Sequence, residues 1–507
     1  MPSSDAIVIG GGINGLAAAG RLAQAGANVT LLESAPATGG MAALAHLCTG
    51  IDARIEKAFA LSAHGLDWVE QNVSTTALSA SGDHLVLKGP FAETVDGSLS
   101  VEDHAAWKAL RTTLLRNAAL LVPFKQMPPP RLARDHGLPL WEALRHGLAI
   151  RRMGRDRLRE FMRLMLINVA DVLDDELTDD RLKGVLAFDT VLGHHAGPRS
   201  PNSLLGLYHR ISGQVAGRQA ALALPRGGMA AITTALHKAV AAAGVTIRCN
   251  SAVTRISADA ERVQSVTMAS GEVLTTGLVV SALHPASTLL SLAGAPQFDT
   301  GVVRRVRNIR SRGTTARLNL TLSEVPDFRG AGHRSRLVIA PSVSAVERAF
   351  NAVKYGAFSA DPVMEIVLPH AFAPDPESGA PTLSALVQFT PHDLRMGWAK
   401  GKPAFLKAIM DQLEQYAPGI GKQVTAAEVM TPHDIAERHA APGGQWHHAE
   451  LSVEQILFLR PAIGLAQYAT PLRGLYLASA AMHPGGGVNG SAGWNAAGAA
   501  LAKAGAP

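Results

Sequence analysis

Near the start of the chain, short apolar runs flank a longer segment of helical composition. Residues 6–9, AIVI, are apolar throughout, which is typical of a strand buried on both faces of a parallel sheet. Residues 13–25 have the composition of a helix, and the apolar residues 29–32 predict a second strand. This order predicts a strand–helix–strand unit, the building block of an α/β fold with a mostly parallel sheet.

The rest of the chain continues to mix strand and helix patterns, and turn signals such as SGE at 270–272 separate them. The apolar runs at 315–322 and 383–389 indicate a sheet separate from the first one. The other expected strands are 245–249, 253–256, 265–268, 278–280 and 475–479. The expected helical regions are 100–125, 140–190, 229–243, 402–417 and about 491–503.

A glycine motif links the first predicted strand to the first predicted helix. Gly10, Gly12 and Gly15 fit the pattern G-x-G-x-x-G, and Glu33 ends the second strand. In such a motif the glycines permit a tight turn, close approach of a pyrophosphate and close helix packing, while the acid accepts hydrogen bonds from a ribose. The sequence therefore predicts a dinucleotide site, and the acid disfavours NADP, which carries a 2′-phosphate.

A second glycine cluster lies near the other end of the chain, in AMHPGGGVNGSAGWNAAG at 481–498. A predicted strand, a glycine loop and a small-residue helix follow one another there, as they do around Gly10. The positive end of that helix would stabilise an anionic group of a bound cofactor, such as the reduced ring of a flavin, and Gly485–Gly487 would let backbone N–H groups approach it. The alternative is a loop that packs a helix against a strand without any ligand.

Composition and charge narrow the classes of function. The 507 residues suggest two domains, and the net charge of +6 is too diffuse to indicate nucleic acid binding. Six arginines fall between positions 151 and 163, where a solvated helix face and contact with an anionic membrane are both open. The two cysteines form no C-x-x-C pair, no metal site is predicted, and no run of 18 apolar residues occurs. We therefore expect a cytoplasmic protein, with peripheral membrane contact as an alternative.

Four stretches resemble the phytoene-desaturase-like FAD oxidoreductases: IVIGGGINGLAAAGRLAQAG, PRGGMAAITTAL, VVSALHPAST and GLYLASAAMHPGGGVNGSAGWNAA. Two more, GPRSPNSLLGLYHR and GGQWHHAELSVEQILFLRP, are similar to the branch of pyridine nucleotide-disulphide oxidoreductase domain proteins. The absence of C-x-x-C contradicts a disulphide reductase despite that branch name. The resemblance covers nearly the whole chain.

The resemblance implies a Rossmann-like FAD-binding domain with an inserted α+β substrate domain. The FAD domain would comprise residues 1–75, 215–300 and 455–507, and the substrate domain 76–214 and 301–454. FAD would bind through its pyrophosphate at Gly10–Gly15, its ribose at Glu33 and its ring near Gly485–Val488. The residues expected at the cofactor are Gly10, Gly12, Ile13, Asn14, Gly15, Glu33, Ser34, Gly39, Gly40, Met41, Val253, Ser281, His483, Gly486, Gly487 and Val488.

His448, His447 and Glu450 are the catalytic candidates, because a histidine near neutral pKa suits proton abstraction beside a flavin. A histidine that only hydrogen-bonds a loop is the alternative. We expect an FAD-dependent oxidoreductase that dehydrogenates, saturates or isomerises a small, largely apolar organic substrate. A flavin amine oxidase on the same fold is the first alternative, although an aromatic content of 5% disfavours an aromatic amine cage. A non-catalytic flavin-binding scaffold is the second.

Overall fold

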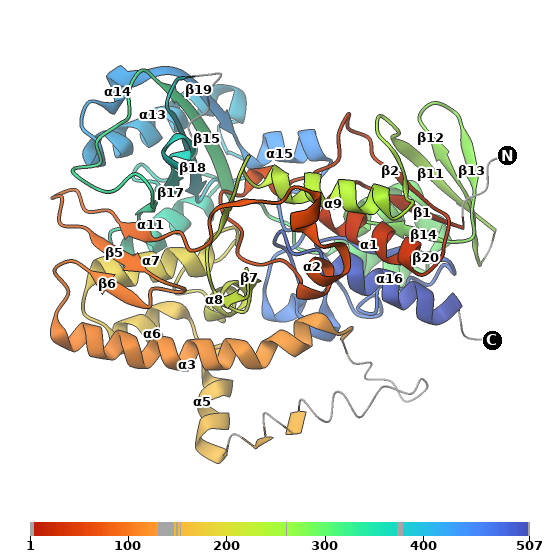
Figure 1. Ribbon diagram of the computed structural model, residues 1–507, viewed down its shortest axis with the longest axis horizontal. Helices are drawn as coiled ribbons and strands as arrows, with labels where there is room; N and C mark the ends of the chain where they lie inside the picture. Colours follow the sequence, from red (N-terminus) through yellow and green to blue (C-terminus); the bar gives the residue numbers. More distant parts are fainter. Residues whose placement is uncertain are drawn as a thin grey trace.

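The computed structural model describes residues 5–129, 147–148, 151–152, 154–259, 261–372 and 379–504. The molecule has two halves that lie side by side (Figure 1). One half is built around a five-stranded sheet and contains both chain ends, and the other is built around an eight-stranded sheet. The predicted fold class, an α/β fold with a mostly parallel sheet, is confirmed.

The first half is built on a sheet of order β10-β2-β1-β14-β20, in which every pair of neighbours is parallel. Every residue of β1, β2, β14 and β20 is buried, as expected for a sheet covered on both faces. The strands are β1 (Ala6–Ile9), β2 (Val29–Leu32), β10 (Thr246–Arg248), β14 (Val279–Ser281) and β20 (Leu475–Leu477). The predicted bounds of β1 and β2 are confirmed.

Helix α1 (Ile13–Gln24) packs against both α9 (Ala230–Ala242) and α16 (Ser491–Ala504). The contact with α16 is close, since a Cβ added to Gly493 would lie 1.8 Å from the carbonyl oxygen of Asn14. Small residues therefore let the last helix of the chain dock on the first one.

A three-stranded antiparallel sheet adjoins the first half, and two short strand pairs connect other segments. The three-stranded sheet comprises β11 (Val253–Ala258), β12 (Val263–Met268) and β13 (Val273–Thr275). The pairs are β3 (Trp68–Glu70) with β9 (Leu224–Pro225), and β7 (Gln214–Val215) with β8 (Arg218–Gln219).

The second half is built on a sheet of order β19-β15-β18-β17-β16-β4-β5-β6, antiparallel except for the pair β16–β4. Two apolar clusters, which contain residues from opposite faces of its strands, form the core of this half. The strands are β4 (Thr75–Ala77), β5 (Leu85–Lys88), β6 (Thr94–Asp96), β15 (Thr315–Leu322), β16 (Arg336–Ile339), β17 (Val363–Val367), β18 (Thr382–Gln388) and β19 (Val424–Met430).

Helices complete both halves, and α3 runs along one edge of the molecule (Figure 1). Within the described ranges, none of them is long and apolar enough to cross a bilayer. The remaining helices are α2 (Ala53–Phe59), α3 (Val101–Gln126), α5 (Arg155–Leu166), α6 (Val169–Glu176), α7 (Asp180–Val191), α8 (Leu204–Ile211), α10 (Thr300–Arg307), α11 (Val343–Val353), α12 (Pro369–Phe372), α13 (Trp398–Tyr416), α14 (Ile420–Gln423) and α15 (Pro432–His439).

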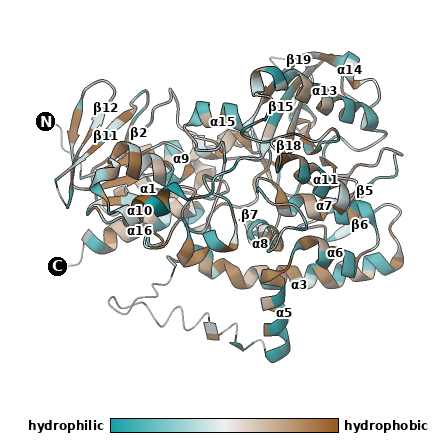
Figure 2. Ribbon diagram, turned by 180° about the vertical axis from the view of Figure 1, so that it is seen from behind, coloured by the Kyte–Doolittle hydropathy of each residue, from teal (hydrophilic) through white to brown (hydrophobic). Residues whose placement is uncertain are grey.

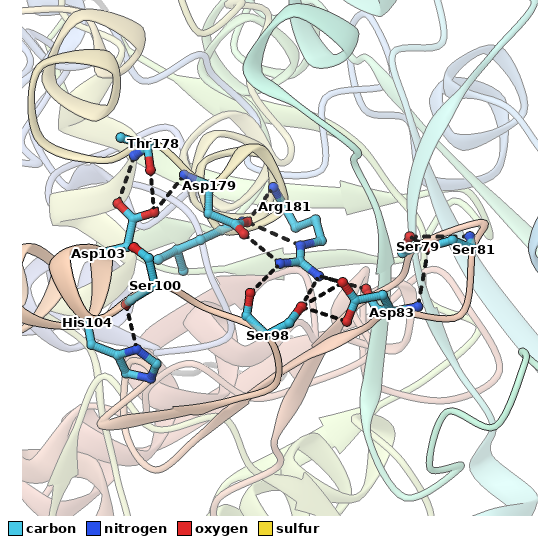
Figure 3. A network of polar contacts seen from close by, with 11 residues as sticks. Ser79, Ser81, Asp83, Ser98, Ser100, Asp103, His104, Thr178, Asp179 and Arg181 are labelled. Atoms are coloured by element: carbon cyan, nitrogen blue, oxygen red, sulfur yellow. Dashed lines mark hydrogen bonds and ion pairs between the residues drawn. The ribbon is translucent and has the colours of Figure 1, made fainter.

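A polar network fixes the first turns of α3 and α7 to each other (Figure 3). The buried Asp103 carboxylate accepts hydrogen bonds from the Thr178 backbone N–H at 2.8 Å, the Thr178 hydroxyl at 2.7 Å and the Asp179 backbone N–H at 2.9 Å. Arg181 then pairs with Asp179 and with Asp83 on the segment before β5. The network sets the direction of α7, whose last turns reach the site described below.

Most other predicted elements differ from the structure by a few residues at their ends, as β11 shows by running to Ala258 instead of 256. The strand predicted to end at 479 ends at Leu477, because its partner β14 ends at Ser281 and offers no further ladder. The helical region 140–190 contains α5, α6 and α7, and its first residues, 140–146, lie outside the described residues. The strands of the five-stranded sheet all come from the segments predicted for the FAD domain, whereas the domain boundaries stay a prediction.

Candidate functional site

A cavity of about 1020 Å³ runs from the glycine loop of α1 into the second half of the molecule. Residues of both glycine clusters line it, together with side chains from α3, α7, α8 and β17. Its volume is at the upper end of the range of about 300–1,000 Å³ for small-molecule sites.

The first glycine loop forms one end of this cavity. Gly12 precedes α1 without a side-chain cap, and Gly12, Ile13 and Asn14 all line the cavity. A Cβ on Gly15 would lie 1.8 Å from the Gly10 carbonyl oxygen, so this turn requires glycine. An uncapped helix start of this kind attracts an anion, because its N–H groups lack partners and the helix dipole is positive there.

Glu33 lies beside this loop at the end of β2. Its carboxylate accepts hydrogen bonds from the backbone N–H of Gly11 at 2.6 Å and of Ala35 at 2.8 Å, and it lines the cavity. The Gly39 N–H donates to the Gly11 carbonyl at 2.9 Å, and Gly39 and Gly40 also line the cavity. The second glycine pair is thus held against the first loop, around an acid placed to accept from hydroxyl groups.

The C-terminal glycine loop faces the same cavity from the other end of the chain. The Gly487 N–H donates to Nδ1 of His447 at 3.1 Å, and a Cβ on Gly486 would lie 2.1 Å from that nitrogen. His209 of α8 donates from Nε2 to the Gly486 carbonyl at 3.0 Å. Gly486, Gly487 and Val488 therefore form a cavity wall with no room for a side chain at Gly486.

Burial keeps the imidazoles around this wall neutral. Desolvation lowers the pKa of His448, His194 and His483 to about 4, and that of His447 and His209 falls well below the ordinary value. The positive charge of the neighbouring Arg460 lowers the pKa of several of them further. At neutral pH each ring consequently has one N–H donor and one acceptor nitrogen.

Hydrogen bonding then assigns the tautomer of His447. Its Nδ1 accepts from Gly487, so the proton lies on Nε2 and this ring presents a donor rather than a base. His448 differs, because its Nδ1 lies 2.7 Å from the Ser479 hydroxyl oxygen, a group that can donate or accept. His448 adopts the left-handed backbone conformation with φ 61°, and its ring lines the cavity.

A buried guanidinium joins the two segments that carry these groups. Arg460 is 1% exposed, and its nitrogens donate to the carbonyls of Met482, Glu450, Gln455, Ala449 and Ala480. Among the described residues no carboxylate pairs with it, and burial lowers its pKa to about 10. Arg460 thus holds the segment after His448 against the segment that precedes the glycine loop.

Lys125 contributes a second cation, which is partly buried, from the last turns of α3. Its Nζ donates to the His209 carbonyl at 3.1 Å and to the Ser212 hydroxyl at 2.9 Å, and the side chain lines the cavity. Burial lowers its pKa to about 8, so near neutral pH this amine can gain or lose a proton.

The cavity wall in the second half of the molecule contains an ionic network. Arg336 is fully buried and bonds to Glu365 at 2.6 Å and to Asp189 at 2.5 Å, and Arg210 bonds to Asp189 at 3.1 Å. His46 Nδ1 lies 3.1 Å from Glu365. Four of these five side chains, all except Arg336, line the cavity. The contacts of Asp189 with Arg336 and Arg210 both involve Oδ1, which leaves Oδ2 to accept a hydrogen bond from a bound molecule.

The structure brings most of the predicted site residues to this one cavity. Those that line it are Gly10, Gly12, Ile13, Asn14, Glu33, Ser34, Gly39, Gly40, Met41, Val253, His447, His448, Gly486, Gly487 and Val488. Gly15 lies just behind the loop, in contact with Gly10.

Besides Gly15, three predicted residues lie outside the cavity lining and have other partners. Glu450 is buried and pairs with Arg312 at 2.8 Å, which makes it part of an ion pair rather than a free acid. The Ser281 hydroxyl lies 2.7 Å from that of Thr288, and His483 donates to the Phe124 carbonyl at 2.6 Å.

Sequence reasoning missed the residues that α3, α7, α8 and β17 bring to the cavity. Lys125, Asp189 and Glu365 lie in ordinary helix or strand patterns that carry no motif. His209 and Arg210 end the stretch GPRSPNSLLGLYHR, which marks the resemblance and was the signal available for both residues.

Comparison with known proteins identifies the group to which this architecture belongs. Residues 5–424 match the family described as FAD dependent oxidoreductase. Pyridine nucleotide-disulfide oxidoreductase domain-containing protein 2 of Rattus norvegicus is 27% identical over 98% of this chain and 93% of its own length. Phytoene desaturase (neurosporene-forming) of Cereibacter sphaeroides is 29% identical over 52% of this chain and 50% of its own length.

Solved structures share the fold at low identity. Cyclohexylamine oxidase from Brevibacterium oxydans has a TM-score of 0.58 at 16% identity, covering 99% of this chain and 98% of that one. A variant of putrescine oxidase has a TM-score of 0.61 at 14% identity, covering 99% and 98%. The resemblance and the FAD cofactor expected from the sequence are confirmed. Because the family match spans most of the chain, this protein belongs to the FAD-dependent oxidoreductases.

Proposed function

We propose that the chain binds FAD along the cavity and dehydrogenates, saturates or isomerises a largely apolar organic molecule that carries one polar group. The observation that carries this proposal is that both glycine loops, Glu33 and a group of neutral histidines all line the same cavity. A dinucleotide and a reacting molecule can therefore meet in one enclosed space.

The residues present fit FAD. The uncapped start of α1 would receive the diphosphate, the Glu33 carboxylate a ribose hydroxyl, and Val253 the adenine through its backbone. The ring would lie against Gly486 and Gly487, because both glycines line the cavity and have no side chain that would hold a ring away. Such a wall admits a flat aromatic group at van der Waals distance.

Bound FAD supplies a hydride acceptor or donor. The chain then has to orient the substrate, exclude water and manage a proton. His447 provides an Nε2–H donor, while His448 is the candidate proton acceptor at Nε2 when Ser479 accepts from its Nδ1. Lys125 is a second group whose pKa, about 8, suits proton transfer near neutral pH.

The chamber beyond the histidines supports an amphipathic substrate. Its apolar side chains would contact the hydrocarbon part, and they are Leu47, Val122, Leu192, Leu222 and Leu386. Arg210 and Asp189 would bind one polar group, since burying charged groups beside a cavity is costly unless they have partners there. The phytoene desaturases among the relatives agree with an apolar body.

The amine oxidase alternative finds less support in the chamber. Several aromatic faces around a cavity favour binding of a cationic amine. Among the described residues that line this cavity, Trp446 is the only tryptophan, tyrosine or phenylalanine. The charges of Asp189 and Glu365 are balanced by those of Arg210 and Arg336. This network can accept a hydrogen bond from a polar group, but it offers no uncompensated negative charge to an ammonium group. The likeness to two amine oxidases concerns the fold.

The test is anaerobic titration of the purified FAD-loaded protein with three substrate classes: isoprenoids with and without a polar end group, and primary amines. Loss of the oxidised flavin absorbance with polar-ended isoprenoids, or their isomerisation without net reduction, supports the proposal. The reduced protein is tested in parallel for saturation of unsaturated analogues. Bleaching by amines alone favours the first alternative, and absence of any turnover with FAD retained favours the scaffold.

Variants in the chamber sharpen this test. Arg210→Met should raise KM for the polar-ended substrate about tenfold or more and leave FAD affinity unchanged, because the guanidinium that it removes pairs with Asp189 of α7, in the second half of the molecule. His448→Gln should lower kcat with little change in KM if the imidazole accepts a proton in the reaction. An equal loss with substrates that lack the polar group would contradict the role given to Arg210.

A further inference from the structure

Helix α5 stands away from the body of the molecule, below α3 in Figure 1. One side anchors it, since Phe161 is 5% and Leu164 is 2% exposed and Leu164 belongs to a core cluster of the second half. The other side leaves Met162 51% and Leu166 56% exposed. The outer side of α5 therefore presents two large apolar side chains to its surroundings.

Arginines surround these two apolar side chains. Arg155, Arg159 and Arg163 follow one another at a spacing of four residues and therefore share one helix face with Met162 and Leu166. All three arginines are exposed. Arg163 Nη2 lies 2.8 Å from Glu160 Oε1, which is a close ion pair. Arg159 Nη1 lies 3.9 Å from Asp156 Oδ1, which is a looser one. Including the exposed Arg151 and Arg152, the helix and its approach contain six arginines against two acids.

This combination selects an anionic lipid surface over a second copy of the chain. Two such helices facing each other would bring like charges together, which opposes self-association. An anionic bilayer attracts each arginine near its surface and accepts apolar side chains between its headgroups. Figure 2 shows that α5, which extends away from the body of the molecule, contains both hydrophilic and hydrophobic residues.

The position of α5 also relates it to the cavity. α5 packs against α8, and α8 contributes Gly206, His209 and Arg210 to the cavity lining. A surface bound through α5 would lie next to the chamber that we assign to the substrate. An apolar substrate dissolved in that surface would then have a short path to the cavity.

We propose that α5 docks this protein peripherally on anionic membranes, with Met162 and Leu166 inserted and the arginines at the headgroups. This docking surface is independent of the reaction catalysed, because none of its side chains lines the cavity. These side chains are Arg155, Arg159, Met162, Arg163 and Leu166.

The experiment measures co-sedimentation of the FAD-loaded full chain with vesicles of phosphatidylcholine alone or with about one third phosphatidylglycerol. Binding is expected to the anionic vesicles at low salt and should weaken on the order of tenfold at high salt. Met162→Ser/Leu166→Ser and Arg155→Gln/Arg159→Gln/Arg163→Gln should each weaken it at least tenfold. Both sets lie on an exposed face, and retained FAD absorbance and thermal midpoint show that folding is intact.

The matched control removes the same charge from the first half of the molecule. Arg255→Gln/Arg304→Gln/Arg307→Gln changes three arginines of β11 and α10 and should leave vesicle binding within about twofold. Equal weakening by this control would assign the binding to net charge and overturn the proposal. So would no wild-type binding at low salt, or a dimer in light scattering that Met162→Ser/Leu166→Ser converts to a monomer.

Discussion

Acidification from pH 7.5 to 5.5 should destabilise this protein strongly, because several histidines are buried in the neutral form. His194, His284 and His483 are each 9% exposed or less. Desolvation lowers their pKa to about 4, 3 and 4. In the unfolded chain the same rings have a pKa of about 6.5.

Stability decreases with decreasing pH because the protein takes up protons when it unfolds. Between pH 6.5 and 4 the unfolded state binds protons on these rings and the folded state does not, so stability falls as pH falls. At pH 5.5 an unfolded ring is about ten-elevenths protonated, which corresponds to about 1.4 kcal/mol for each histidine. Three rings together give about 4 kcal/mol, a large part of a typical stability of about 5–15 kcal/mol.

The assay is urea unfolding of the FAD-loaded protein at pH 7.5, 6.5 and 5.5, followed by circular dichroism and by release of flavin fluorescence. His483→Gln keeps a donor toward the Phe124 carbonyl. It should remove about one third of the loss of unfolding free energy that the three rings together cause on acidification. His433→Gln, at a side chain that is 44% exposed, is the control for replacing a histidine outside this buried group. A free energy of unfolding that stays constant within about 1 kcal/mol across this range would refute the reasoning.

Three further predictions concern the glycine loop, the ribose acid and the polar network. Gly486→Ala places a Cβ 2.1 Å from His447 Nδ1 and should weaken FAD binding at least about tenfold in a titration of apoprotein, whereas Gly332→Ala, in open space, should not. Glu33→Gln should weaken FAD binding about ten- to a hundredfold through loss of a charge-assisted acceptor, and unchanged affinity would contradict its placement at the ribose. Asp103→Ala removes three accepted hydrogen bonds and should lower the free energy of unfolding by about 2–4 kcal/mol, with a loss under about 1 kcal/mol arguing against the network.

Local sequence determined the first strand–helix–strand unit of this protein. The bounds of β1 and β2 follow from apolar runs, and the turn between β1 and α1 follows from glycines at Gly10 and Gly15. These features depend on residues close in sequence, so periodicity and turn chemistry are sufficient to predict them. The C-terminal glycine loop was predictable for the same reason.

The tertiary structure decided which side chains meet in the cavity and which do not. His209 bonds to Gly486 across 277 positions of sequence, and Arg336 brings Asp189 to Glu365 from three separate elements. Glu450 looked like a free acid beside two histidines, yet Arg312 pairs with it. Side-chain direction and partner choice depend on how distant elements pack, and neither quantity is encoded in the spacing of residues along the chain.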